Sequence, residues 1–176
     1  MGKAKLTRSQ LSHSTWPKAI ALGQGRTKPN KLSADYIVGL TDGEGSFTVF
    51  LRPPSKKERS VHYRVLCRYY IKMREDDLPL LKKVQRFWGC GKIYFQKEYR
   101  PNQRDNYRFE IFDWATLKNV VIPFFIKNRL ESKRIKDFRI FCKILNLAMN
   151  KAHHTKSGIA KIQQLKSQMH AYLGLA

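Results

Sequence analysis

The stretch Tyr36-Ile-Val-Gly-Leu-Thr-Asp-Gly-Glu-Gly-Ser-Phe47 joins an apolar helical pattern to a turn in which acids and glycines alternate. Ser33 can cap the helix, and Asp35 in its first turn suits the positive end of the helix dipole. We expect the helix to end near 43–45. The following residues, 46–51, alternate as a strand does, and two prolines then stop it. A helix that turns directly into a strand is thus the first unit of the fold.

The turn itself predicts chemistry. A carboxylate at the end of a helix, here Glu44, lies near backbone carbonyls that have no helical partner, and both are oxygen ligands suited to a hard divalent cation. Such a cation can activate water and stabilise a phosphodiester displacement. The flanking glycines permit close backbone approach and positive φ. The alternative is an ordinary glycine stop with a solvated acid, which would be preferred for an isolated Asp-Gly pair.

Composition points to a polyanionic partner. Lys and Arg number 35 against 13 Asp and Glu in 176 residues, a formal charge of +22, which suits nucleic acid or an anionic membrane surface. No apolar run reaches the roughly 18 residues that span a bilayer. The start lacks the apolar core of a secretory signal, and the three cysteines are few and odd in number. We therefore expect an intracellular protein, cytoplasmic or organellar, and no membrane partner.

The charge also divides the chain. Every acid lies between Asp35 and Asp137, whereas the first 34 residues hold seven cations and are rich in Ser, Thr, Gly and Pro. We predict that 1–32 is a flexible basic arm that contacts phosphates and that 33–176 is a single domain. The alternatives for the arm are a solubilising tail or an organellar transit peptide.

Four strands and several helices follow from the remaining pattern. A second strand over 62–72 alternates apolar and basic residues, with Leu66 as the exception on the basic face. Helices are expected before Gly89, after Asp113 with a kink or break at Pro123, over 135–149, and after a loop at 150–158 as far as Tyr172. Two more strands are expected near 92–99 and 107–112. The prediction is an α+β fold whose antiparallel sheet has one covered face and one cationic, aromatic face open to nucleic acid. The alternative is that any half-buried sheet has a polar face.

The motif resembles the signature of the LAGLIDADG homing endonucleases, and further similarities follow it in order. They lie at Ile37–Gly45, Arg74–Leu78, Phe87–Ile93 and Ile122–Phe125, so that the resemblance covers about residues 32–150. It implies the αββαββα fold with extra C-terminal helices, and Mg²⁺-dependent double-strand cleavage of long, specific DNA sites. Because the chain has one copy of the motif, the resemblance implies a homodimer on a near-palindromic site, joined by motif helices through Ile37, Gly39, Leu40 and Asp42.

The resemblance also assigns roles in catalysis. Glu44 matches the metal-binding carboxylate, and the Gly43 carbonyl matches the backbone ligand. Asp42 matches the first acidic position, for which we expect a structural role at the helix ends; direct metal binding is the alternative. Lys133 and Lys127 are both candidates for a basic residue near the scissile phosphate. Met73 stands where the family often has a polar residue, so the partner that orders water stays unassigned.

Alternation of the strands, counted from the motif, gives the side chains expected to contact DNA. They are Thr48, Phe50, Arg52, Arg64, Arg68, Tyr70, Lys72, Tyr94, Gln96, Arg108 and Glu110. Arg and Lys can pair with guanine, Gln with adenine and Glu with cytosine. A slip of one residue would invert the assignments on that strand.

Other functions remain open at this point. The main alternative is an RNA-binding intron maturase on the same fold, a reading that the retained Glu44 disfavours. Weaker alternatives are a regulator without nuclease activity and a basic protein of ribosomal type. The histidines and cysteines lack zinc spacing, and no phosphate-binding glycine loop occurs.

Overall fold

The computed structural model describes residues 31–55 and 61–170. Most of the predicted basic arm, residues 1–30, therefore lies outside the described residues. The same holds for the basic turn at 56–60 and for Tyr172.

The motif folds as predicted into helix α1 (Ala34–Glu44) followed at once by strand β1 (Gly45–Arg52). The Ser33 hydroxyl accepts a hydrogen bond from the Tyr36 amide at 3.1 Å, which confirms the cap. Gly45 has φ −78°, so the expected positive φ is wrong there. The glycine is instead required by packing, because a Cβ atom would lie 2.7 Å from the Thr41 Cα atom.

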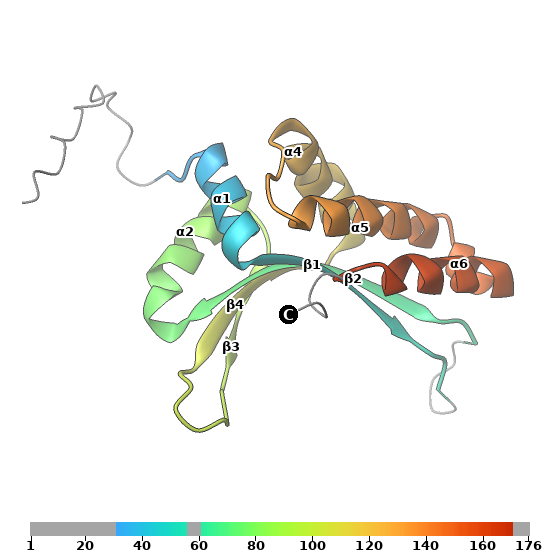
Figure 1. Cartoon of the computed structure of the whole chain (residues 1–176), viewed down its shortest axis with the longest axis horizontal. Helices are drawn as coiled ribbons and strands as arrows, with labels where there is room; N and C mark the ends of the chain where they lie inside the picture. Colours follow the sequence, from blue (N-terminus) through green and yellow to red (C-terminus); the bar gives the residue numbers. More distant parts are fainter. Residues whose placement is uncertain (1–30, 56–60, 171–176) are drawn as a thin grey trace, which may run out of the picture.

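Strands β2 (Arg64–Arg74), β3 (Lys92–Gln96) and β4 (Asn106–Ile111) complete an antiparallel sheet in the order β1-β2-β4-β3. The register pairs Thr48 with Arg68 and Tyr70 with Glu110, which keeps the predicted polar residues on one face. The opposite face is buried, as the alternation in β2 predicted. The four strands form an arch with the helices on its outer side (Figure 1).

Helices cover the apolar face of this sheet (Figure 1). Helix α2 (Leu78–Trp88) has Pro79 in its first turn and stops at Gly89, which adopts the left-handed conformation. Helices α4 (Ile122–Lys127), α5 (Arg134–Met149) and α6 (Lys156–Ser167) follow the last strand. The αββαββα arrangement with additional C-terminal helices is therefore confirmed.

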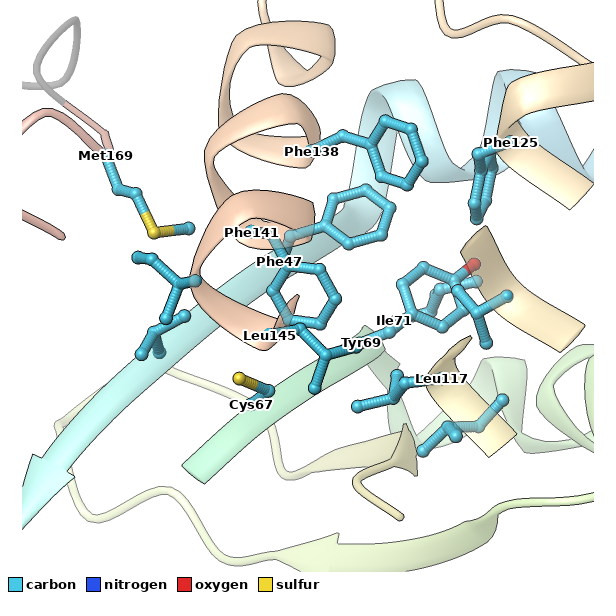
Figure 2. Close-up of a cluster of buried hydrophobic side chains, with 14 of the residues drawn as sticks. Phe47, Cys67, Tyr69, Ile71, Leu117, Phe125, Phe138, Phe141, Leu145 and Met169 are labelled. Carbon is cyan, nitrogen blue, oxygen red and sulfur yellow. The ribbon is translucent and has the colours of Figure 1, made fainter. Parts of the chain in front are cut away.

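An aromatic cluster joins α5 to the sheet directly behind the motif (Figure 2). The Phe47 ring lies 5.1–5.4 Å from the rings of Tyr69, Phe125, Phe138 and Phe141, measured between centroids. All five side chains are buried. Because Phe47 is three residues from Glu44, this buried aromatic cluster fixes the position of the acidic turn.

The helix after Asp113 differs from the prediction of a kink or break at Pro123. A short helix α3 (Trp114–Thr116), capped by Asp113, runs through a π-helical turn at Leu117–Val121 into α4. The Ile122 amide bonds to the Leu117 carbonyl, five residues back. The irregularity thus precedes Pro123, which falls in the first turn of α4.

The C-terminal segment also departs from the prediction. Thr155 accepts a bond from the Gly158 amide at 3.0 Å and starts α6 inside the expected loop. After α6 the chain returns to α5, where the buried Asp137 carboxylate accepts from the His170 amide at 2.9 Å and pairs with its Nδ1 atom at 3.0 Å. Within the described residues no helix is long and apolar enough to cross a bilayer.

Candidate active site and nucleic-acid interface

The end of α1 is anchored to the sheet from within the core. The Thr41 and Tyr69 hydroxyls form a buried hydrogen bond of 2.8 Å. Burial raises the pKa of the Tyr69 hydroxyl above its ordinary value, so it stays protonated. This bond fixes the last turn of α1, and with it the acidic turn, relative to β2.

The first acid of the turn, Asp42, is hydrogen-bonded within the chain. The Asp42 carboxylate accepts bonds from the Glu131 amide at 2.9 Å, the Ser132 amide at 3.2 Å and the Ser132 hydroxyl at 2.6 Å. Asp42 therefore ties the end of α1 to the segment before α5. This fits the expected structural role of Asp42 at the helix end, and its place at a dimer interface stays a prediction.

A residue that the sequence analysis missed completes this anchor. The Arg134 guanidinium donates to the Asp42 carbonyl at 2.9 Å and to the Gly43 carbonyl at 2.7 Å. Both carbonyls belong to the end of a helix and would otherwise lack a helical partner, and a cation there also suits the helix dipole. Arg134 thus occupies one face of the carbonyl that the resemblance gave to a metal ion.

Glu44, the last residue of α1, takes no part in this hydrogen-bond network. Its side chain is exposed and makes no hydrogen bond or ion pair with the rest of the described chain. It lines an open groove of about 1270 Å³ between α1, the sheet and the start of α5. The groove residues are Asp42, Glu44, Gly45, Ser46, Thr48, Tyr70, Lys72, Met73, Arg74, Asp77, Asn106, Glu131, Ser132, Lys133, Arg134 and His170.

Of the two candidate lysines, only one lines this groove. Lys133 lines it together with Glu44, from the residue that precedes α5. Lys127 is exposed at the end of α4 and is not one of the groove residues. The geometry therefore brings Glu44 and Lys133 to one site and leaves Lys127 outside it.

The donor set at the groove suits a hard cation but does not complete a site for one. Glu44 offers a carboxylate and Gly43 a carbonyl that already accepts from Arg134. No group of three or more His, Cys, Asp or Glu side chains that could hold a metal occurs in the described part of the chain. Two other exposed carboxylates, Asp77 and Glu131, line the same groove. Phosphate and water oxygens are the further ligands that a bound nucleic acid would bring.

The polar face of the sheet carries the predicted contact residues together. Pairing partners in an antiparallel sheet point to the same side, so the register aligns Arg52 with Arg64, Thr48 with Arg68 and Lys72 with Arg108. Tyr94 and Gln96 join them from β3 through their partners on β4. This face and the groove adjoin, since Thr48, Tyr70 and Lys72 belong to both.

Glu110 is the exception on this face. Its side chain is 3% exposed, and its two oxygens pair with Arg68 at 3.0 Å and Arg108 at 2.9 Å. The prediction that Glu110 contacts a base is therefore wrong, because two cross-strand arginines cover the carboxylate. Sequence alternation gives the face of a residue but not what its neighbours on other strands place over it.

The outer side of α1 differs from the prediction at one position. Ile37 is fully buried in the protein's own core, so its side chain is not available to a second helix. Gly39 is exposed, and a Cβ atom built there would meet nothing within 4 Å. Tyr36 is exposed and Leu40 half-buried on the same helix.

Known proteins are similar to this chain in sequence. The sequence profile described as LAGLIDADG endonuclease matches residues 37–145. Two Neurospora crassa proteins, probable intron-encoded endonuclease 3 and probable intron-encoded endonuclease 2, are 32% and 31% identical over 130 and 140 residues. These alignments cover 74% and 78% of this chain but only 23% and 29% of the relatives, so the chain spans less than a third of their length.

Solved structures agree on the fold. The homing endonuclease I-TnaI is 32% identical with a TM-score of 0.68, over 80% of this chain and 90% of that one. The LAGLIDADG homing endonuclease I-SmaMI, solved bound to cleaved DNA, is 25% identical with a TM-score of 0.68, over 78% of this chain and 44% of that one.

Proposed function

The chain belongs to the LAGLIDADG endonuclease family, and on that premise we propose that it is a site-specific homing endonuclease that makes a double-strand break in DNA. The observation that carries the proposal is Glu44: an exposed carboxylate without a partner in the described chain, in a groove shared with Lys133. The groove adjoins a sheet face rich in arginine and aromatic side chains. A carboxylate beside phosphates weakens binding electrostatically, so its presence there favours chemistry over binding alone.

The cofactor that we propose is a divalent cation, with Mg²⁺ as the ion. Glu44 and the second lone pair of the Gly43 carbonyl would hold it. When bound, such a cation supplies Lewis-acid stabilisation of the phosphodiester charge and lowers the pKa of a bound water.

The chain's own residues supply position and charge. Asp42 and Arg134 hold the end of α1 rigid, so that Glu44 presents its carboxylate without having to be ordered during the reaction. Lys133 brings an ammonium group to the same groove, where it can neutralise charge that develops on the phosphate or leaving oxygen. We retain Lys133 and not Lys127 as the catalytic lysine.

We further propose that two copies act together through α1. One chain offers one Glu44, whereas cutting a duplex requires two sites. Gly39 and Gly43 are exposed four residues apart on α1, and small side chains at this spacing let a second helix approach closely. Leu40 and Tyr36 would pack at the edges of that contact. A homodimer is expected to bind a near-palindromic site.

The partner is double-stranded DNA, and the sheet face would lie in its major groove. The alternative, an RNA-binding maturase, would be favoured by one outcome of the experiment below. An intracellular location, cytoplasmic or organellar, is supported by the intron-encoded names of the relatives.

The decisive experiment is cleavage of a randomised, near-palindromic duplex library by the full chain with Mg²⁺, beside Glu44→Gln and a Ca²⁺ control. We expect defined cuts with the wild-type protein and Mg²⁺ only. Tight binding of DNA without cutting by any divalent ion would contradict a nuclease and favour a regulator. Binding of structured RNA alone would favour the maturase.

The dimer has its own test. Gly39→Leu adds a side chain whose Cβ atom meets nothing within 4 Å in the described part of the chain, but which blocks the approach of a second helix. We expect a folded monomer by circular dichroism and sedimentation at concentrations where the wild type is dimeric, and a melting temperature that no longer depends on protein concentration. A wild-type chain that is monomeric on its cleaved site would contradict the dimer.

A further inference from the structure

The polar face of the sheet holds one buried acid in the middle of its cations. Glu110 on β4 is 3% exposed at the side chain, although it lies on the face that is open to solvent. One carboxylate oxygen pairs with Arg68 of β2, and the other pairs with Arg108 of β4. The same carboxylate therefore holds both guanidinium groups.

Each arginine is also held by an aromatic ring. The Arg68 guanidinium carbon lies 5.5 Å from the centre of the Phe50 ring, and that of Arg108 lies 5.4 Å from the Tyr70 ring. A guanidinium that pairs with a carboxylate and stacks on a ring has lost most of its rotational freedom before any ligand arrives.

Both arginines nevertheless reach the surface. Their side chains remain 30% and 24% exposed, and they line a hollow of about 240 Å³ together with Tyr94, Glu110 and Phe112. A guanidinium has five N–H donors, and each pairing with Glu110 joins one terminal nitrogen to one oxygen. The Nε atoms of both arginines are buried, so the donors left for a ligand in the hollow are the remaining terminal N–H groups.

The acid is unfavourable for binding phosphate. A purely electrostatic surface gains affinity from each cation and loses it with each anion, since binding depends on the number of neutralised phosphates. Glu110 lowers the charge of the cluster from two positive charges to one. What it contributes in return is orientation, which matters for reading base edges and not for contacting phosphates.

We propose that Glu110 is a positioning residue for DNA specificity: it orients Arg68 and Arg108 to read guanine edges in the major groove and does not itself contact DNA. Bidentate pairing of arginine with guanine O6 and N7 requires a guanidinium plane held at a defined angle. This inference rests on the proposed DNA-binding function. The inference goes beyond that function because it distinguishes arginines that are oriented to contact base edges from cations that contact only phosphate.

The test compares specific and non-specific binding in the presence of Ca²⁺. The full chain first selects its preferred duplex from a randomised double-stranded DNA library. The affinities for that duplex and for a scrambled duplex of equal length are then measured for the wild type, Glu110→Gln and Glu75→Gln. Glu75 is exposed and lies outside the groove, so its substitution removes the same charge without touching the cluster.

We expect Glu110→Gln to bind the scrambled duplex as well as the wild type or better, while the ratio of specific to non-specific affinity falls about fivefold or more. Glu75→Gln should leave that ratio unchanged. Selection with Glu110→Gln should also lose a guanine preference at the base pairs that face the cluster. If Glu110→Gln keeps the wild-type ratio, the acid does not position the arginines and the proposal is overturned.

Two further observations keep the test decisive. Arg108→Lys preserves both Glu110 and the net charge but removes the planar donor, so it should lose the same guanine preference even if Glu110→Gln does not fold. Retention of that preference in Arg108→Lys would overturn the proposal. A wild-type protein that selects no sequence would instead refute site-specific binding itself, before any variant is compared.

Discussion

Glu44 and Glu110 belong to two regions that treat a carboxylate in opposite ways. At the end of α1, Arg134 is directed to the backbone carbonyls of Asp42 and Gly43, and Glu44 keeps an exposed carboxylate without a partner in the described chain. In the middle of the sheet, two arginines converge on Glu110 and bury it. The comparison teaches that a carboxylate among cations becomes available to a ligand only when the fold gives those cations other acceptors.

The largest expected effect is on cleavage at the first region. Glu44→Gln removes the groove carboxylate that matches the metal ligand of the family, while the exposed Asp77 and Glu131 of the groove are kept. We expect cleavage to fall by roughly a thousandfold or more. Thermal stability should remain at the wild-type value, because Glu44 bonds to nothing in the described chain. Cleavage assays beside melting curves check both statements, and cutting at the wild-type rate would remove Glu44 from the mechanism.

The next effect tests whether the groove depends on its anchor. Asp42→Ala deletes the acceptor of three hydrogen bonds to Glu131 and Ser132, and we expect a loss of about 2 kcal/mol in unfolding free energy. Cleavage should fall as well, since the end of α1 and the start of α5 then move independently. Chemical denaturation gives the free energy. Full stability with full activity would show that the anchor is dispensable.

A smaller effect is expected behind the turn. Tyr69→Phe leaves the Thr41 hydroxyl without its buried partner and should cost about 1 kcal/mol of unfolding free energy. Because Phe retains the aromatic packing against Phe47, the affinity for DNA should not change. Denaturation and DNA titration on the same sample separate the two quantities, and a loss of affinity without a loss of stability would contradict this role.

The smallest effect lies where the two regions meet. Lys72 lines the groove and stands opposite Arg108 in the sheet register. If it contacts only phosphate, Lys72→Gln should weaken binding equally for all sequences and lower the slope of log affinity against log salt by about 1. Titrations at several salt concentrations measure the slope. A changed base preference would show that Lys72 contacts base edges and not only phosphate.

Much of this architecture follows from local sequence. The alternation in β2 gave the buried face, and the helix-turn-strand pattern gave the position of Glu44, because both depend on neighbours a few residues away. The cap at Ser33 and the stop at Gly89 follow from the same local rules.

The missed features depend on distant residues. Arg134 bonds to the end of α1 across a sequence separation of 92 residues. The local sequence does not distinguish Arg134 from the neighbouring Lys133. Glu110 was assigned to the correct face, but its burial depends on Arg68 from another strand. Ile37 was assigned to an interface by its place in the motif, whereas the turn of the helix directs it into the core.

The bonds between the end of α1 and Ser132 close a loop of 90 residues, which has a consequence for synthesis. The ribosome delivers Glu44 and all four strands before it delivers the second wall of the groove. The entropy of closing so long a loop must also be offset by packing that α5 contributes. A chain interrupted during translation after β4 therefore carries the whole polar face of the sheet and Glu44, but lacks the groove residues Lys133 and Arg134.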